Sequence, residues 1–256
     1  MDEIRIENMN WMDIKEAIES GYKTVVVGVG SNEQHGPHLP TKTDGFIGDI
    51  LSFEIAKKLG NALQAPAIRV GCSDPHLSFA GTISLRESTL KAIIEDYVNS
   101  LKRHGFTHMI FLPTHGGNFN ALREVIDQLQ KSNPAVVLFA PTDFEEMMEG
   151  GKELRAKLGV TPEEAGSHAG ETETSMMLYF AEDLVKTDRF TPGFVGEFGP
   201  EQMVLWEKEG MPAISDIGVI GDPRKSTKEH GKLYLDSSVW RIMALESMKV
   251  ILKEFL

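Results

Sequence analysis

The sequence contains a single cysteine, Cys72, among its 256 residues. One thiol excludes an internal disulfide and any metal site built on paired cysteines. Long hydrophobic runs are also missing, and none approaches the ~20 residues with which a helix crosses a bilayer. Because Asp2 and Glu3 are acidic where a secretory signal is basic, we expect a cytoplasmic protein with no membrane partner.

Positive charge is scarce as well. The 26 Lys and Arg residues stand against 38 Asp and Glu residues, which gives a formal net charge of -12. Nucleic acids and anionic membrane surfaces attract clustered basic residues, so neither is expected as the main partner. A hydrophobic content of 41% is sufficient for a sizeable core, and no repeat or linker marks a boundary. We therefore expect one domain over residues 1–256.

Strand and helix patterns alternate along the chain, which predicts an α/β fold: three α/β/α layers around a mostly parallel sheet. A β-branched apolar run predicts a buried strand at 24–29. Further strands are expected at 65–70, 108–112 and 135–139, and helices at 10–20, 45–59 and 88–104, from 118 to about 132, and from about 170 onward.

The loop after the first strand carries four side chains of the kinds that bind divalent metals: Glu33, His35, His38 and Asp44. One glycine and two prolines among them exclude a regular helix and fix the turns of the loop. Open α/β sheets bind ligands beyond the carboxyl ends of their strands, where this loop is expected. The alternative is that the carboxylates cap helices and the histidines are solvated.

A second segment of this kind follows the 108–112 strand. His115 is its candidate ligand, and Gly116 and Gly117 let the backbone pass close to a substrate or metal. Since loops after parallel strands converge on one edge of the sheet, His115 can reach the first loop. A loop histidine that bonds its own backbone is the simpler alternative.

A third cluster consists of His168, Glu171 and Glu173 and precedes an apolar helical run. The helix dipole alone favours carboxylates in a first turn, by ~0.3 to 1 kcal/mol. It does not account for the histidine. Together these side chains can supply one further metal ligand and one general acid or base.

The ligand types discriminate between metals. Imidazole and carboxylate without thiolate fit Zn, Mn or Fe(II). The candidates are too many for a single catalytic zinc with an open position, so we expect two divalent metal ions that share one carboxylate. The candidates are Glu33, His35, Asp44, His115 and one later glutamate.

Five motifs occur in order along nearly the whole chain: G-S-N-E-Q-H-G-P-H-L-P from Gly30 with Thr43-Asp44, His76 with G-T-I-S-L from Gly81, T-H-G-G-N from Thr114, H-A-G-E-T-E-T-S from His168, and G-V-I-G-D-P from Gly218. Together they resemble the creatininase (creatinine amidohydrolase) family of metal-dependent hydrolases. The resemblance implies a creatininase-like fold and a homohexamer. The apolar residues Met203, Val204, Leu205 and Trp206 are compatible with subunit contacts or with a core.

The resemblance also implies roles for residues of the first two motifs. The family's matches to Glu33 and His35 bind one metal each, the match to Asp44 bridges both, and the match to His115 completes one side. From its place two residues before Pro40, His38 is expected either to orient the loop or to support the metal ligands from behind.

At two positions the chain departs from creatininase itself, which has a Tyr and a Glu where this chain has Gly116 and Gly117. The fifth ligand must then come from elsewhere, with Glu173 as first choice and Glu171 as second. The departure also argues against creatinine as the substrate.

The expected reaction is hydrolysis of a non-peptide C–N bond, in a cyclic amide, lactam or formamide, by a metal-activated hydroxide. The resemblance implies that His168 carries a proton, and either His168 or Glu171 would protonate the leaving nitrogen. Ser73 and His76 are expected to line the substrate pocket with the two glycines, although a structural role for His76 is equally well supported. The alternatives are a peptidase-like member acting on a cofactor precursor, a lyase or isomerase, and a non-catalytic ligand-binding relative.

Overall fold

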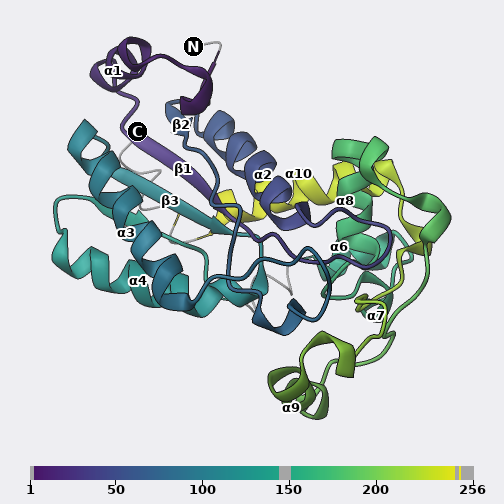
Figure 1. The fold of residues 1–256 in the computed structure, drawn as a ribbon. Coiled ribbons are helices and arrows are strands. Elements are labelled where there is room, and N and C mark those ends of the chain that lie inside the picture. Colours follow the sequence, from purple (N-terminus) through teal and green to yellow (C-terminus); the bar gives the residue numbers. More distant parts are fainter. Residues whose placement is uncertain (1–2, 144–150, 246–247, 249–256) are drawn as a thin grey trace.

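The computed structural model describes residues 3–143, 151–245 and 248. Its centre is a parallel sheet with strand order β2-β1-β3-β4 (Figure 1). The strands are β1 (Thr24–Val29), β2 (Ala62–Gln64), β3 (His108–Pro113) and β4 (Val137–Phe139). β1 and β3 pair along their whole lengths, from Thr24 opposite His108 to Val29 opposite Pro113, so both strands end at the same edge. Every residue of both strands is buried, as expected for strands covered on both faces.

Helices cover both faces of this sheet (Figure 1). On one face pack α1 (Trp11–Glu19), α3 (Glu87–His104) and α4 (Phe119–Ser132), and on the other pack α2 (Thr43–Leu59) and α10 (Lys228–Ala244). Alternate residues of β1 serve the two layers, because Val25 and Val27 face α3 whereas Val26 faces α2. The predicted α/β class with three layers is confirmed.

α8 (Glu171–Ala181) packs against α10 and extends the second layer beyond the sheet. The two helices approach closely at Gly231, where a Cβ atom would lie 2.0 Å from the carbonyl oxygen of Ser175. The remaining helices are α6 (Lys152–Lys157), α7 (Pro162–Ala165), α9 (Pro200–Glu209) and the 3₁₀ turns η1 (Ile6–Asn8), η2 (Asp74–His76), η3 (Gly116–Asn118), η4 (Glu182–Leu184), η5 (Thr187–Arg189), η6 (Met211–Ala213) and η7 (Pro223–Lys225). Among the described helices, none has the length and apolar content to cross a membrane.

One predicted strand is wrong. The strand expected at 65–70 is replaced by β2 at Ala62–Gln64. Pro66 has no N–H to donate and interrupts the ladder, so Ile68 returns to β1 only as an isolated bridge to Val29. Residues 65–72 still run beside β1, and they bring Cys72 to the site at the end of that strand.

Candidate functional site

The site lies where β1 and β3 end. The loop after β1 carries Glu33 and His35, and Asp44 lies in the first turn of α2. The start of α2 rests directly on the end of β1, because a Cβ atom at Gly30 would lie 2.5 Å from the backbone nitrogen of Gly45. From the loop after β3, the Thr114 hydroxyl donates to the Asp44 carbonyl at 2.8 Å. The two loops are thereby joined beside the candidate ligands.

Asp44 stands between two histidines. Its Oδ1 lies 3.0 Å from His35 Nε2, and its Oδ2 lies 3.2 Å from His115 Nδ1. The opposite ring nitrogens are held by the backbone, since His35 Nδ1 donates to the Glu33 carbonyl at 3.0 Å and His115 Nε2 donates to the Cys72 carbonyl at 2.8 Å. In their neutral forms both rings therefore direct a lone pair toward Asp44, the orientation that a metal ligand requires.

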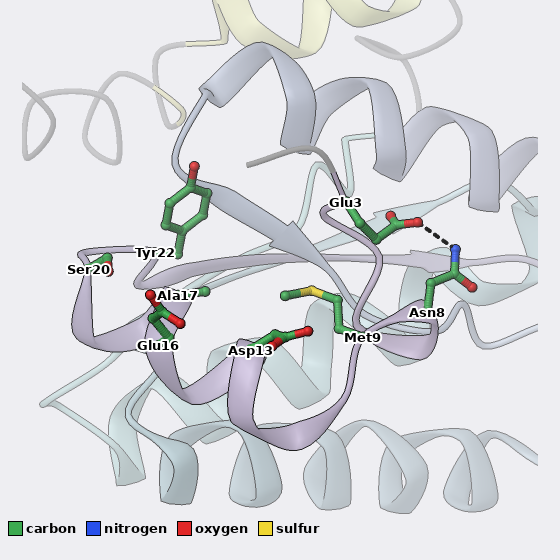
Figure 2. Close-up of a pocket in the computed structure, with 8 residues that line it drawn as sticks. All are labelled: Glu3, Asn8, Met9, Asp13, Glu16, Ala17, Ser20 and Tyr22. Carbon is green, nitrogen blue, oxygen red and sulfur yellow. Dashed lines mark hydrogen bonds between the residues drawn. The ribbon is translucent and has the colours of Figure 1, made fainter.

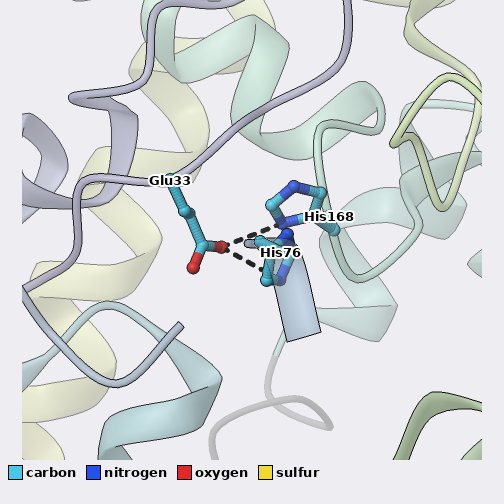
Figure 3. A group of neighbouring side chains, drawn as sticks. All are labelled: Glu33, His76 and His168. Carbon is cyan, nitrogen blue, oxygen red and sulfur yellow. Dashed lines mark ion pairs between the residues drawn. The ribbon is translucent and has the colours of Figure 1, made fainter. Parts of the chain in front are cut away.

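Glu33 is fully buried, and neither of its oxygens receives a hydrogen bond from the described residues. Three imidazoles surround it: His76 Nε2 and His168 Nδ1 each lie 3.4 Å from Oε1, and His115 Nε2 lies 3.3 Å from Oε2. Figure 3 shows two of these rings converging on the carboxylate. Burial raises the pKa of Glu33 to about 7. A buried carboxylate without hydrogen bonds is a group that a cation would satisfy.

The charges of the cluster depend on one another. Burial disfavours the imidazolium form of His35, yet the Asp44 carboxylate raises its pKa to about 10. Burial also disfavours the imidazolium form of His115, yet the Glu33 carboxylate raises the pKa of this ring to about 9. Burial and the neighbouring histidines lower the pKa of His76 to about 3 and that of His168 well below its ordinary value. The two outer rings are therefore neutral near pH 7.

Gln34 fixes the tautomers of those outer rings. Its backbone carbonyl accepts from His168 Nε2 at 2.7 Å, which leaves the His168 Nδ1 lone pair directed at Glu33. Its side-chain nitrogen donates to His76 Nδ1 at 2.9 Å, and its Oε1 accepts from the backbone of Gly36. A Cβ atom at residue 218 would lie 2.0 Å from that Oε1, so Gly218 is needed for the amide to fit. Sequence reasoning missed this residue, and its only signal was its place between two candidate ligands.

Glu171 and Glu173 point in different directions from the first turn of α8, as residues i and i+2 of a helix do. Glu173 Oε2 accepts from the backbone of Ala169 at 2.6 Å and lies 3.7 Å from His35 Nε2. Ala169 holds this position with a φ of 52°, a left-handed conformation unusual for a residue with a side chain.

Glu171 lies outside the cluster. Its oxygens accept from Ser175 Oγ at 2.9 Å, His230 Nδ1 at 2.8 Å and the Tyr234 hydroxyl at 2.7 Å. These partners belong to α8 and α10, so the carboxylate serves their packing. We therefore assign Glu171 no part in the proposed reaction, neither as a catalytic group nor as a replacement for Glu173.

Among the residues that the structure describes, three groups of side chains each bring one possible ligand atom per residue within 4.8 Å of one another. They are Glu33, His35 and Asp44; His35, His168 and Glu173; and Glu33, His76 and His168. Four of the eight histidines of the chain, residues 35, 76, 115 and 168, thus gather with three carboxylates. The cluster could hold metal.

Ser73 and His76 lie at the site as expected. The Ser73 hydroxyl lies 3.4 Å from His115 Nε2 and bonds to the hydroxyl of Ser31. The ring of His76 meets Trp206 of α9 edge to face at 5.1 Å. His38 is turned away, because its Nε2 bonds Thr174 Oγ1 at 2.9 Å.

The two glycines after His115 are exposed but not equivalent. A Cβ atom at Gly116 would meet nothing within 4 Å, whereas at Gly117 it would lie 2.1 Å from the Cys72 carbonyl oxygen and 2.6 Å from His115 Nε2. This backbone leaves no room for a side chain at 117. The next residue, Asn118, had no role in the sequence interpretation, yet its side chain accepts from the Cys72 N–H at 3.0 Å and donates to the Gly30 carbonyl at 2.9 Å.

Two pockets differ in their relation to this cluster. The larger, of about 460 Å³, lies near the amino end of β1 (Figure 2). Its lining consists of Glu3, Asn8, Met9, Asp13, Glu16, Ala17, Ser20 and Tyr22 and includes none of the cluster residues. The smaller pocket, of about 180 Å³, includes His168 and Glu173 and thus adjoins the cluster.

A three-layer α/β fold with imidazoles and carboxylates gathered beyond its strand ends is typical of metal-dependent enzymes. The sequence profile of the creatininase family, described as creatinine amidohydrolase, matches residues 7–245. The chain belongs to this family.

Individual relatives agree with the family match. A mycofactocin precursor peptide peptidase of Mycobacterium ulcerans (strain Agy99) is 31% identical over 223 residues, which cover 84% of this chain and 81% of the relative. The creatinine amidohydrolase of Pseudomonas putida is 27% identical over 248 residues, 91% and 92% of the two chains. A solved structure described as creatininase Mn superposes with a TM-score of 0.79 at 24% identity, over 94% of this chain and 96% of the other. The chain is thus an enzyme, a hydrolase of C–N bonds, and the predicted family and enzyme class are confirmed.

Proposed function

We propose that this enzyme hydrolyses an amide C–N bond at a site of two divalent metal ions. The observation that carries the proposal is the position of Asp44, whose two oxygens face different histidines at 3.0 and 3.2 Å. A carboxylate placed in this way can join two cations.

The side chains present fit such ions. One would be held by Glu33, Asp44 and His115, and the other by Asp44, His35 and Glu173. The buried oxygens of Glu33 and the Oδ2 of Asp44, which receive no hydrogen bonds from the described residues, support this division. Imidazole and carboxylate ligands suit Zn, Mn and Fe, and two creatininase structures are described as Mn and as Zn-Zn type. When bound, such ions lower the pKa of a water molecule and polarise a carbonyl group.

His168 is the proton carrier in this proposal. Its Nε2 proton is committed to the Gln34 carbonyl, so Nδ1 is free to accept a proton on the side of Glu33. Because burial keeps the ring neutral near pH 7, Nδ1 can take a proton from the attacking water and return it to the nitrogen as the C–N bond breaks. We assign substrate contacts to Ser73 and His76, which lie beside the candidate ligands, and to the exposed Gly116 and Gly117.

The substrate remains a choice between two kinds of amide. The sequence interpretation favours a cyclic amide, lactam or formamide. A peptide bond is the second candidate, because the precursor peptide peptidase is more similar to this chain than the creatinine amidohydrolase is, at 31% against 27% identity.

The test is metal analysis of the purified protein, followed by hydrolysis assays with Mn, Zn or Fe(II) added back. The assays would use creatinine, simple lactams, formamides and short peptides as substrates. We expect two ions per chain and metal-dependent hydrolysis of at least one class. Protein that binds no metal would overturn the proposal, whereas metal without C–N hydrolysis would favour a lyase or isomerase.

Three expectations from the sequence stay predictions: a single domain, a homohexamer and a cytoplasmic location. Met203, Val204 and Leu205 on α9 are exposed, which supports their use in subunit contacts. Light scattering coupled to size-exclusion chromatography measures the assembly directly.

A further inference from the structure

The backbone is strained at one point on the edge of the cluster. Among the described residues, Ala169 is the one residue other than glycine with a positive φ, at 52°. Its Cβ atom makes this left-handed conformation costly, so neighbouring groups must hold it in place. Ala169 directly follows His168, the proposed proton carrier, and precedes the first turn of α8, which carries Glu173. The strained residue therefore joins two groups of the candidate site.

The N–H group of Ala169 shows what the strained turn provides. It donates to Glu173 Oε2 at 2.6 Å, and the same oxygen lies 3.7 Å from His35 Nε2. The φ angle of Ala169 sets the direction of this N–H group relative to α8. A change to a right-handed conformation would turn the donor away from the carboxylate. The left-handed turn thus fixes the Glu173 carboxylate beside His35, where the second ion is proposed.

The residues on either side of Ala169 are held by other segments. The backbone of Ile220 accepts from the His168 N–H at 3.3 Å and donates to the His168 carbonyl at 2.9 Å. After the turn, a Cβ atom at Gly170 would lie 2.3 Å from the carbonyl oxygen of Ala165. These contacts fix the two neighbours of Ala169 but not the carbonyl group of Ala169 itself.

The hydroxyl of Thr174 faces that carbonyl from inside α8. Thr174 is fully buried, and its Oγ1 donates to the Ala169 carbonyl oxygen at 3.4 Å and bonds His38 Nε2 at 2.9 Å. His38 Nδ1 has no hydrogen-bond partner among the described residues, so the proton of the neutral ring is assigned to Nε2, where it has an acceptor. With His38 donating to Oγ1, the hydroxyl proton of Thr174 is directed at Ala169.

We infer that Thr174 is a positioning residue, whose hydroxyl holds Ala169 in the left-handed conformation from which the Ala169 N–H fixes Glu173. The inference rests on the proposed function for the role of Glu173 as a metal ligand, but the turn itself can be measured in metal-free protein. Glycine adopts a φ of 52° without the cost that a Cβ atom imposes. Ala169→Gly should therefore remove the need for the Thr174 hydroxyl.

The first experiment is calorimetric titration of the full-length, metal-free protein with Zn²⁺. Thr174→Val replaces the hydroxyl by a methyl group of similar size. In this variant, affinity for the ion that Glu173→Gln removes should fall about twofold to tenfold, as expected for one hydrogen bond. Thr174→Ser keeps the hydroxyl and should keep the wild-type affinity. The double variant Thr174→Val/Ala169→Gly should bind Zn²⁺ as tightly as Ala169→Gly alone.

The double variant separates positioning from a general loss of stability. Thr174→Val also leaves the His38 Nε2 proton buried without an acceptor, and Ala169→Gly does not replace this acceptor. The double variant should thus unfold at a lower denaturant concentration than Ala169→Gly, although the two bind Zn²⁺ equally. If Thr174→Val alone does not fold, this pair still gives the comparison. Weaker Zn²⁺ binding by the double variant than by Ala169→Gly would overturn the inference and make Thr174 a purely structural residue.

Hydrogen exchange measured by mass spectrometry tests the turn without any ion. In metal-free protein, the Ala169 amide should exchange faster in Thr174→Val than in the wild type or Thr174→Ser. Thr89→Val is the matched control, because Thr89 lies on α3 at the opposite face of the sheet, and it should change neither exchange at Ala169 nor Zn²⁺ affinity. A wild-type protein that binds no Zn²⁺ would count against the proposed function. Equal exchange of the Ala169 amide in the wild type and Thr174→Val would overturn the inference.

Discussion

Glu33 and Glu171 are both fully buried carboxylates, yet their surroundings are opposite. At the junction of α8 and α10, Glu171 accepts hydrogen bonds from Ser175, His230 and Tyr234. At the end of β1, Glu33 has three imidazoles within 3.4 Å and no hydrogen bond from the described residues.

The difference separates a structural carboxylate from a ligand. A buried carboxylate whose two oxygens both accept hydrogen bonds is compensated within the protein and fixes the packing of its neighbours. A buried carboxylate without hydrogen bonds costs the fold about 1 to 3 kcal/mol. Its retention among three histidines is understandable if a cation completes the site.

The largest effect is expected for Asp44→Ala, because the variant loses the carboxylate whose two oxygens face His35 and His115. We predict fewer than two ions per chain and a fall in kcat/KM of about a thousandfold or more, since bound ions supply several kcal/mol of charge stabilisation. Elemental analysis and steady-state kinetics measure both quantities. Asp96→Ala, at an exposed position on α3, is the control. An Asp44→Ala protein that keeps two ions would show that the bridging assignment is wrong.

His168→Gln should lower kcat by roughly 10² to 10⁴, the usual contribution of a general acid or base, without changing the metal content. This result would separate His168 from the ligand set, although its ring lies among possible ligand atoms. Loss of an ion in this variant would instead identify His168 as a ligand and contradict its role as proton carrier.

Replacing each of the two glutamates of α8 in turn tests the distinction between a structural carboxylate and a metal ligand. Glu171→Gln should lower the free energy of unfolding by about 1 to 3 kcal/mol and leave the metal content unchanged, because a hydrogen-bonded carboxylate at the α8–α10 junction is lost. Glu173→Gln should remove one ion and change stability less. Chemical denaturation and elemental analysis of both variants decide the matter. The reverse pattern would make Glu171 the ligand.

Much of the site could be anticipated from the sequence because its ligands come directly after recognisable strands. The run at Thr24–Val29 can only be a buried strand, and the loop after this strand must lie at the sheet edge. The same argument places His115 after β3. Parallel pairing then brings the two loops together without any knowledge of side-chain contacts.

Other features depend on contacts between distant segments. The choice between Glu171 and Glu173 follows from His230 and Tyr234, which lie 59 and 63 residues after Glu171. The role of Gln34 depends on the space beside Gly218. Local pattern cannot supply either contact. The displaced β2 strand has a local cause, since Pro66 lies within the apolar run that predicted the strand.

The acid stability of the fold tests a histidine that the cluster does not use. Burial lowers the pKa of His38 to about 4. Between pH 6.5 and about 4, the His38 side chain is therefore protonated in the unfolded chain but neutral in the folded chain. The stability that neutral His38 provides is complete above pH 6.5 and is lost as the pH falls toward 4, up to about 3 kcal/mol. His38→Gln should flatten the pH dependence of unfolding in this interval. His104→Gln, at an exposed position on α3, should not.

The smallest effect distinguishes two adjacent glycines. In Gly117→Ala the new methyl group would lie 2.1 Å from the Cys72 carbonyl oxygen, which also accepts from His115 Nε2. The backbone must shift, at a cost of about 1 to 3 kcal/mol, with the lower end expected because the turn is exposed. Gly116→Ala meets open space and should change the free energy of unfolding by less than about 0.5 kcal/mol. Denaturant titration measures both, and metal affinity should fall only in Gly117→Ala, since the shift moves the group that orients His115. Equal behaviour of the two variants would mean that the Cys72 carbonyl does not hold the ring.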